Sequence, residues 1–128
     1  MAIADEIEAF KPFKAVYGNI DGHEIRNIYP ENQRFNYEGM DVWITHIGGY
    51  PGNYAPKVRN MIRSDAPGLF ISGHSHILKV MPDKKLGLLH INPGAAGKSG
   101  FHLVRTAVRF VIDEGRISDL EVIELGSR

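Results

Sequence analysis

Two histidines separated by one residue are the first candidate for chemistry in the sequence, although this pattern alone is a weak signal. His74 and His76 follow residues 68–72, an apolar run that predicts a buried strand. Side chains two residues apart point to the same side of an extended backbone, so both imidazoles are expected to face one pocket. Neutral imidazole is the commonest protein ligand of metal ions. The pair therefore predicts half of a metal site, although histidines at this spacing also occur on surfaces and at core edges.

Two segments upstream carry further polar residues where a predicted strand ends. Asn19 and Asp21 follow a short strand predicted over residues 14–17, and His46 follows a strand predicted over residues 41–45. Residues on loops at strand ends are held by the sheet and leave room for a substrate. Imidazole, amide and carboxylate ligands suit Mn, Fe, Zn or Ni and do not distinguish among them. Asn19 and Asp21 between glycines also fit an ordinary turn, and His46 also fits a capped strand end.

Composition narrows the classes of protein that the chain can represent. Its 128 residues predict a single domain, residues 1–128. Fifteen basic and fifteen acidic side chains cancel, so neither nucleic acid nor an anionic membrane is an expected partner. Cysteine is absent, so any metal is held by nitrogen and oxygen ligands. No apolar run approaches about 18 residues and no signal peptide is recognisable, which makes a cytoplasmic location the default.

The hydrophobic pattern changes along the chain. The first half predicts β and α elements: a helix over residues 3–10, two strands over 33–37 and 40–45 joined at Glu38-Gly39, a glycine-rich loop over 47–53, and a helix over 56–64 with Val58, Met61 and Ile62 facing inward. The second half predicts antiparallel hairpins: strands over 78–81 and 86–91, then over 106–112 and 117–123. This order predicts an α/β fold with two sheets and helices outside them.

Four other residues are expected to have ordinary structural roles. Trp43 lies in an apolar strand and is predicted to belong to the core. His23, His90 and His102 have no partners at ligand spacing and are expected at the surface or at an edge.

Four motifs in register resemble those of the calcineurin-like metallophosphoesterases, in particular their small bacterial and archaeal phosphodiesterase branch. The motifs are Gly18-Asn19-Ile20-Asp21, Thr45-His46, Gly73-His74-Ser75-His76 and Ile91-Asn92-Pro93-Gly94. The resemblance covers nearly the whole chain and implies a four-layer α/β/β/α sandwich. It also implies that Asn19, His46 and His74 bind one metal ion, that His76 binds a second, and that Asp21 assists the leaving group or orients the substrate.

The chemistry that this resemblance implies is phosphoester hydrolysis, with phosphodiesters as the favoured class. Two divalent ions about 3.5–4 Å apart activate a water for in-line attack on the phosphorus of a small phosphoester substrate. The family's first two motifs, Asp-x-His and Gly-Asp, have no counterpart in the 17 residues before Gly18. We therefore expect a sandwich truncated at its N-terminus, at most one weakly held ion and little phosphoesterase activity. Strands exposed by such a truncation would favour a homo-oligomer. The alternative is a non-catalytic binding scaffold, as in the retromer subunit of this fold.

Overall fold

The computed structural model describes residues 14, 16, 30–97 and 104–127. Within these residues the elements are β1 (Asn32–Tyr37), β2 (Met40–Thr45), β3 (Gly49–Tyr50), β4 (Asn53–Tyr54), α3 (Pro56–Ser64), β5 (Leu69–Ile71), β6 (Lys79–Asp83), β7 (Leu88–Asn92), β8 (Val104–Asp113) and β9 (Arg116–Ser127). The helix predicted over residues 3–10 lies outside the described residues. No described helix is long and apolar enough to span a membrane.

Five strands form the main sheet in the order β1-β2-β5-β7-β6. The β1–β2 pair is the predicted antiparallel hairpin, and its turn residues Glu38 and Gly39 both have positive φ angles, 49° and 80°. Strands β2, β5 and β7 run parallel, whereas β6 is antiparallel to β7. The second predicted hairpin is therefore confirmed, but Pro82 and Asp83 belong to β6 and β7 begins only at Leu88. The β8–β9 hairpin is also as predicted, with a longer second strand.

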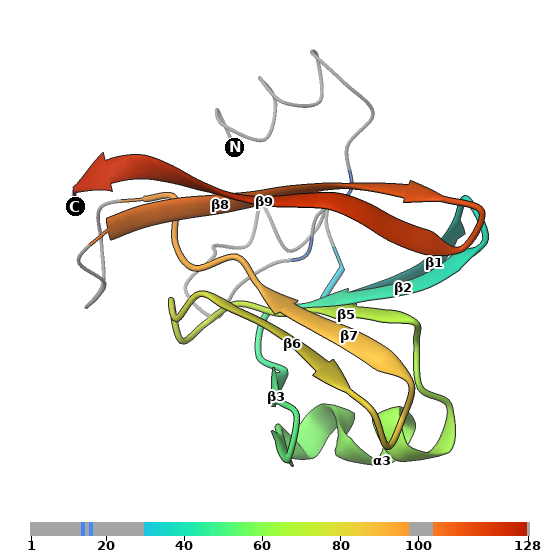
Figure 1. The fold of residues 1–128 in the computed structure, drawn as a ribbon. Helices are drawn as coiled ribbons and strands as arrows, with labels where there is room; N and C mark the ends of the chain where they lie inside the picture. The colour runs from blue at the N-terminus through green and yellow to red at the C-terminus, as the bar shows by residue number, and fades with distance from the viewer. Residues whose placement is uncertain (1–13, 15, 17–29, 98–103, 128) are drawn as a thin grey trace.

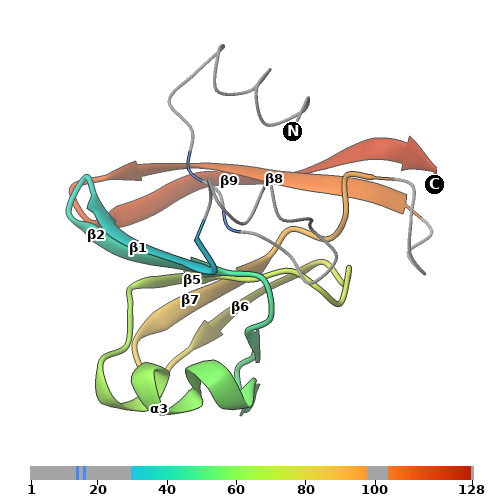
Figure 2. The same ribbon diagram turned by 180° about the vertical axis from the view of Figure 1, so that it is seen from behind.

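The main sheet is covered on both faces. The β8–β9 hairpin lies across one face and α3 lies across the other, as the two opposite views show (Figures 1 and 2). Neighbouring residues of each strand point to opposite faces. Val42 and Leu69 belong to the cluster under β8–β9, whereas Trp43 and Phe70 belong to the cluster under α3. The described residues thus contain one helical layer and two β layers of the predicted sandwich. Trp43 lies in the core, as predicted.

Helix α3 has the predicted bounds, but one of its inward residues was predicted wrongly. Pro56 occupies the start of the helix, where its missing N–H costs no hydrogen bond. Val58 and Ile62 are buried, because residues four apart lie on one face. Met61 is 48% exposed. The helix presents the face with Val58 and Ile62 to the sheet, so position 61 lies at the side of the helix.

The glycine-rich segment after His46 was predicted as a loop, and this prediction is wrong in part. Two-residue strands β3 and β4 pair in an antiparallel hairpin. Backbone hydrogen bonding also ties the hairpin's end to its start, because the Ala55 N–H donates to the Gly48 carbonyl at 2.9 Å. The hairpin orders the chain between the end of β2 and α3.

Tyr54 anchors this hairpin to the end of β6, and its hydroxyl is expected to stabilise the fold. Tyr54 is buried and donates to Asp83 Oδ2 at 2.7 Å. Burial and this bond raise the pKa of Tyr54, so the hydroxyl stays protonated. We expect Tyr54→Phe to lower the free energy of unfolding by about 1–2 kcal/mol in urea denaturation. The control is Tyr50→Phe, because the exposed Tyr50 hydroxyl only accepts from Asn53 Nδ2 at 3.3 Å. Equal losses of unfolding free energy in the two variants would contradict a stabilising role for the Tyr54 hydroxyl.

Candidate metal centre

His46 and His74 meet at one edge of the main sheet. His46 directly follows β2 and His74 follows β5, and these strands are parallel neighbours whose carboxyl ends meet at the same edge. His74 Nδ1 lies 3.3 Å from His46 Nε2. The two ring centroids are 5.1 Å apart and the ring planes are inclined by 80°. His46 is half-buried and His74 is exposed, so the pair is open to a small molecule from solvent.

The two loops that hold these histidines are joined to each other. The Gly73 N–H donates to the His46 carbonyl at 2.9 Å. Gly48 is buried and packs so closely on the end of β5 that a Cβ there would lie 2.6 Å from the Phe70 ring and 2.7 Å from Ser72 Cβ. A side chain at position 48 would therefore push the His46 loop away from β5.

The backbone that places His74 is not the extended one on which the prediction for His74 and His76 rested. Strand β5 ends at Ile71, and His74 and His76 have φ angles of 67° and 62°. Left-handed backbone is uncommon for residues other than glycine and often marks functional sites. The alternation of an extended strand therefore does not set the directions of these two imidazoles.

The described residues contain a pair of candidate ligands rather than a complete set. No three His, Cys, Asp or Glu side chains within those residues are grouped in a way that could hold a metal ion. His76 is half-buried at the end of the loop. Asn19 and Asp21 lie outside the described residues. Their predicted roles are therefore untested.

The separation of the His46 and His74 nitrogens suits a shared metal ion. Two nitrogens bound 2.0–2.1 Å from Zn²⁺ at the tetrahedral angle are about 3.3–3.4 Å apart. The observed distance is 3.3 Å. The same distance also suits an N–H···N hydrogen bond between the two rings, in which one facing nitrogen keeps its proton. The donor chemistry and the spacing fit a divalent cation at this edge.

His90 is not the surface or edge residue that the sequence predicted. It is only 1% exposed, and its Nδ1 lies 3.2 Å from the Phe70 carbonyl oxygen. The reason is that β7 lies inside the sheet, between β5 and β6, and position 90 shares the α3 face with Leu88. Burial lowers the pKa of His90, and the nearby Lys79 charge lowers it further, although the bond to Phe70 acts in the opposite direction.

The buried imidazole is expected to make the fold less stable in mild acid. The folded pKa of His90 lies below the ordinary value, so the unfolded chain binds more protons below about pH 6.5. The neutral His90 side chain makes its full contribution to stability above that pH. This contribution is lost as the pH falls through the pKa of His90 in the folded protein. We expect His90→Asn, which retains a donor close to the Nδ1 position, to reduce the loss of stability between pH 7.5 and 5.5. Urea unfolding at both pH values measures the free energy of unfolding of each protein. An equal loss of stability in His90→Asn and in wild type would contradict this expectation.

Sequence reasoning assigned no separate role to Asn92, although it is buried beside the histidine loop. Its side-chain amide donates to the Gly73 carbonyl and to Ser75 Oγ, both at 3.1 Å. The signal available in the sequence was the motif Ile91-Asn92-Pro93-Gly94, in which Asn92 directly follows the strand predicted over residues 86–91.

The family is shown by a comparison of the sequence with family models. Residues 1–115 match the model described as the calcineurin-like phosphoesterase superfamily domain. The chain belongs to this superfamily. The match agrees with the resemblance that the four motifs indicated, and with the layers of the fold. A search of curated proteins finds no match to the chain.

Solved structures support the same fold for this superfamily member. An archaeal phosphodiesterase has a TM-score of 0.72 at 20% identity, with 98% of this chain and 76% of that chain covered. Vps29 from Chaetomium thermophilum has a TM-score of 0.69 at 14% identity, covering 99% and 76%. Wild-type Vps29 from Entamoeba histolytica, complexed with Zn²⁺, has a TM-score of 0.62 at 16% identity, covering 87% and 68%. At these identities the similarity establishes the fold alone.

Proposed function

We propose that the protein is a metal-dependent phosphoesterase, with phosphodiesters as its substrate class and His46 and His74 as ligands of one divalent ion. The observation that supports this most directly is the 3.3 Å distance between His46 Nε2 and His74 Nδ1. The two histidines come from adjacent parallel strands, at the sheet edge where ligands of open α/β sheets usually lie. Membership of the phosphoesterase superfamily and the Zn²⁺ in a structural neighbour support the same function.

The chain's own groups have defined tasks in this proposal. His46 Nε2 and His74 Nδ1 must both be unprotonated to coordinate a cation, so the two ring protons reside on His46 Nδ1 and His74 Nε2. A bound divalent ion lowers the pKa of a coordinated water and neutralises phosphate oxygens. The exposed His74 leaves one side of the pair open to a small phosphoester.

The remaining ligands are carried over from the family motifs. Asn19 completes the set of His46 and His74. In the family pattern His76 corresponds to a ligand of a second ion, and our proposal includes only the ion held by His46 and His74. Asp21 is assigned to the leaving group or to substrate orientation. Among Mn, Fe, Zn and Ni, the imidazole pair does not select one ion.

The test is hydrolysis of bis(p-nitrophenyl) phosphate by the chain with Mn²⁺ added. Because the described residues supply only a pair of imidazole ligands at the site, we expect slow hydrolysis that exceeds the protein-free rate with Mn²⁺ and disappears with EDTA. Hydrolysis that persists in EDTA would contradict a metal-dependent reaction. A rate equal to that of Mn²⁺ alone would contradict the enzyme assignment.

A non-catalytic binding scaffold is the second candidate, and exposed apolar side chains beside the site favour it. Ile77 and Leu78 are exposed between His76 and β6. Val80 and Met81 are exposed on β6, the edge strand beside β7, and point to opposite faces of the sheet. A scaffold would retain its binding function after His74→Ala and lose it after Ile77→Ser, whereas an enzyme would show the reverse for hydrolysis.

A further inference from the structure

The side-chain amide of Asn92 makes hydrogen bonds to two different segments of the chain. It ends β7 and is 4% exposed. Its Nδ2 donates to the Gly73 carbonyl and to Ser75 Oγ, each at 3.1 Å, and its Oδ1 accepts from the Gly94 N–H at 3.0 Å. The bond from Gly94 fixes which end of the amide faces the histidine loop, because only Nδ2 can donate.

The two acceptors of Asn92 lie on either side of His74 in the chain. Further bonds tighten this turn: the Ser75 N–H donates to the Gly73 carbonyl at 2.8 Å, and the Ile77 N–H donates to Ser75 Oγ at 3.2 Å. Between them His74 has the left-handed φ of 67°, which a residue with a side chain adopts at a cost unless its surroundings impose it. Asn92 is a buried group that supplies such a constraint.

We propose that Asn92 is a positioning residue that holds His74 in its left-handed conformation and so keeps His74 Nδ1 opposite His46 Nε2 for metal binding. This inference rests on the proposed function and extends it by naming the group that builds the ligand pair. An amide suits the task because it has two donors and one acceptor in a fixed plane. A serine would supply one donor, and a carboxylate would supply none.

Calorimetric titration of the full chain with Zn²⁺ tests the inference. Asn92→Asp retains the acceptor for Gly94 and removes both bonds to the histidine loop. We expect its Zn²⁺ affinity to fall by about 10–100-fold, as for other groups that orient metal ligands. The added negative charge would by itself favour a cation, so it cannot cause the loss. Ser75→Ala, at an exposed position, removes one acceptor and is expected to give a smaller loss in the same direction.

Thr106→Val is the matched control. Buried Thr106 donates to the Pro93 carbonyl at 2.7 Å, so the control also loses a bond to the segment after β7 but leaves the histidine loop intact. We expect wild-type Zn²⁺ affinity for this variant. An equal loss in Thr106→Val, or affinity of Asn92→Asp within twofold of wild type, would overturn the inference. If Asn92→Asp does not fold, unchanged affinity in Ser75→Ala overturns it.

Hydrogen exchange provides a readout without metal. In Asn92→Asp we expect the Ser75 and Ile77 amides to exchange at least about tenfold faster than in wild type, and in Thr106→Val we expect no change. Unchanged exchange at both amides would overturn the inference even if the proposed function holds. Absence of Zn²⁺ binding by the unaltered chain would instead refute the proposed metal centre, and with it the metal role of Asn92.

Discussion

His74→Ala is expected to abolish the protein-dependent part of Mn²⁺-dependent bis(p-nitrophenyl) phosphate hydrolysis, so that the rate falls to that of Mn²⁺ without protein. The substitution removes one of the two imidazoles whose facing nitrogens lie 3.3 Å apart. Without it the cation is held by fewer ligands, and the activation of water that the cation supplies is lost. His46→Ala is expected to have the same effect, because the two side chains act as one unit. Initial rates of hydrolysis at saturating Mn²⁺ measure the effects of both substitutions.

The comparison needs a control variant on the same loop. Ile77 is 62% exposed, so Ile77→Ser changes the loop's surface without removing a proposed ligand. We expect this control to keep its hydrolysis rate within about twofold. His74→Ala is itself expected to fold, because His74 is exposed. Full turnover by His74→Ala would show that His74 is not a ligand of the reacting centre.

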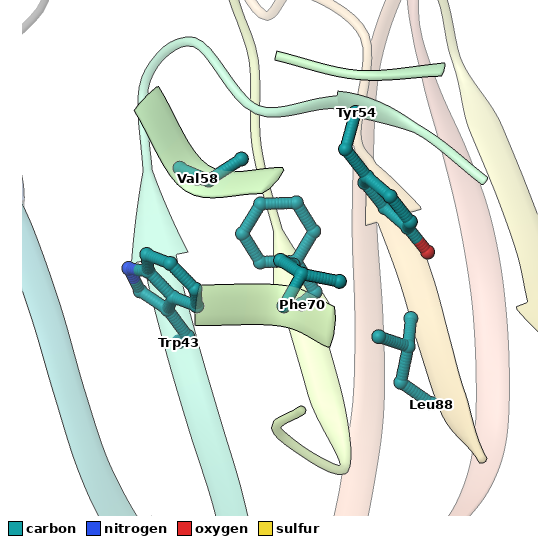
Figure 3. Close-up of a cluster of buried hydrophobic side chains, with 6 residues drawn as sticks. Trp43, Tyr54, Val58, Phe70 and Leu88 are labelled. Carbon is teal, nitrogen blue, oxygen red and sulfur yellow. The ribbon is translucent and has the colours of Figure 1, made fainter. Parts of the chain in front are cut away.

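Phe70→Ala is expected to destabilise the protein by about 3–5 kcal/mol, because the substitution leaves a cavity at the centre of the core. Phe70 is fully buried, and its ring lies 5.2 Å from that of Trp43 and 6.0 Å from that of Tyr54, centroid to centroid. Figure 3 shows Phe70 between these two rings, with Val58 and Leu88 beside it. The melting temperature should fall by about 10–20 °C in a calorimetric scan.

Met61→Ala on α3 is the control for this substitution. Met61 is 48% exposed, so its truncation should change stability by no more than about 0.5 kcal/mol. Similar losses for the two variants would mean that the core is not centred on Phe70. Because Gly48 packs on the Phe70 ring, Phe70→Ala should also loosen the loop that holds His46.

Local sequence patterns predicted the strands and the superfamily well. The hairpin signal at Glu38-Gly39 located β1 and β2 and the turn between them, and alternation of apolar and polar residues located β8. Strand ends rich in ligand residues identified His46 and His74, which the structure brings together. These features depend on short-range chemistry, which a sequence displays directly.

Features that depend on tertiary contacts were not predictable in the same way. The left-handed backbone at His74 is accompanied by bonds from Asn92, 18 positions along the chain, and a periodicity argument cannot include them. The burial of His90 follows from the order of strands in the sheet. The exposure of Met61 follows from how α3 rotates on that sheet.

A crystal of the chain grown with Zn²⁺ tests most directly whether His46 and His74 share one metal ion, as we propose. Diffraction data on both sides of the zinc absorption edge would locate the ion. We predict one anomalous peak about 2.0–2.1 Å from both His46 Nε2 and His74 Nδ1. A zinc ion bound elsewhere, with these two nitrogens hydrogen-bonded to each other, would contradict the account.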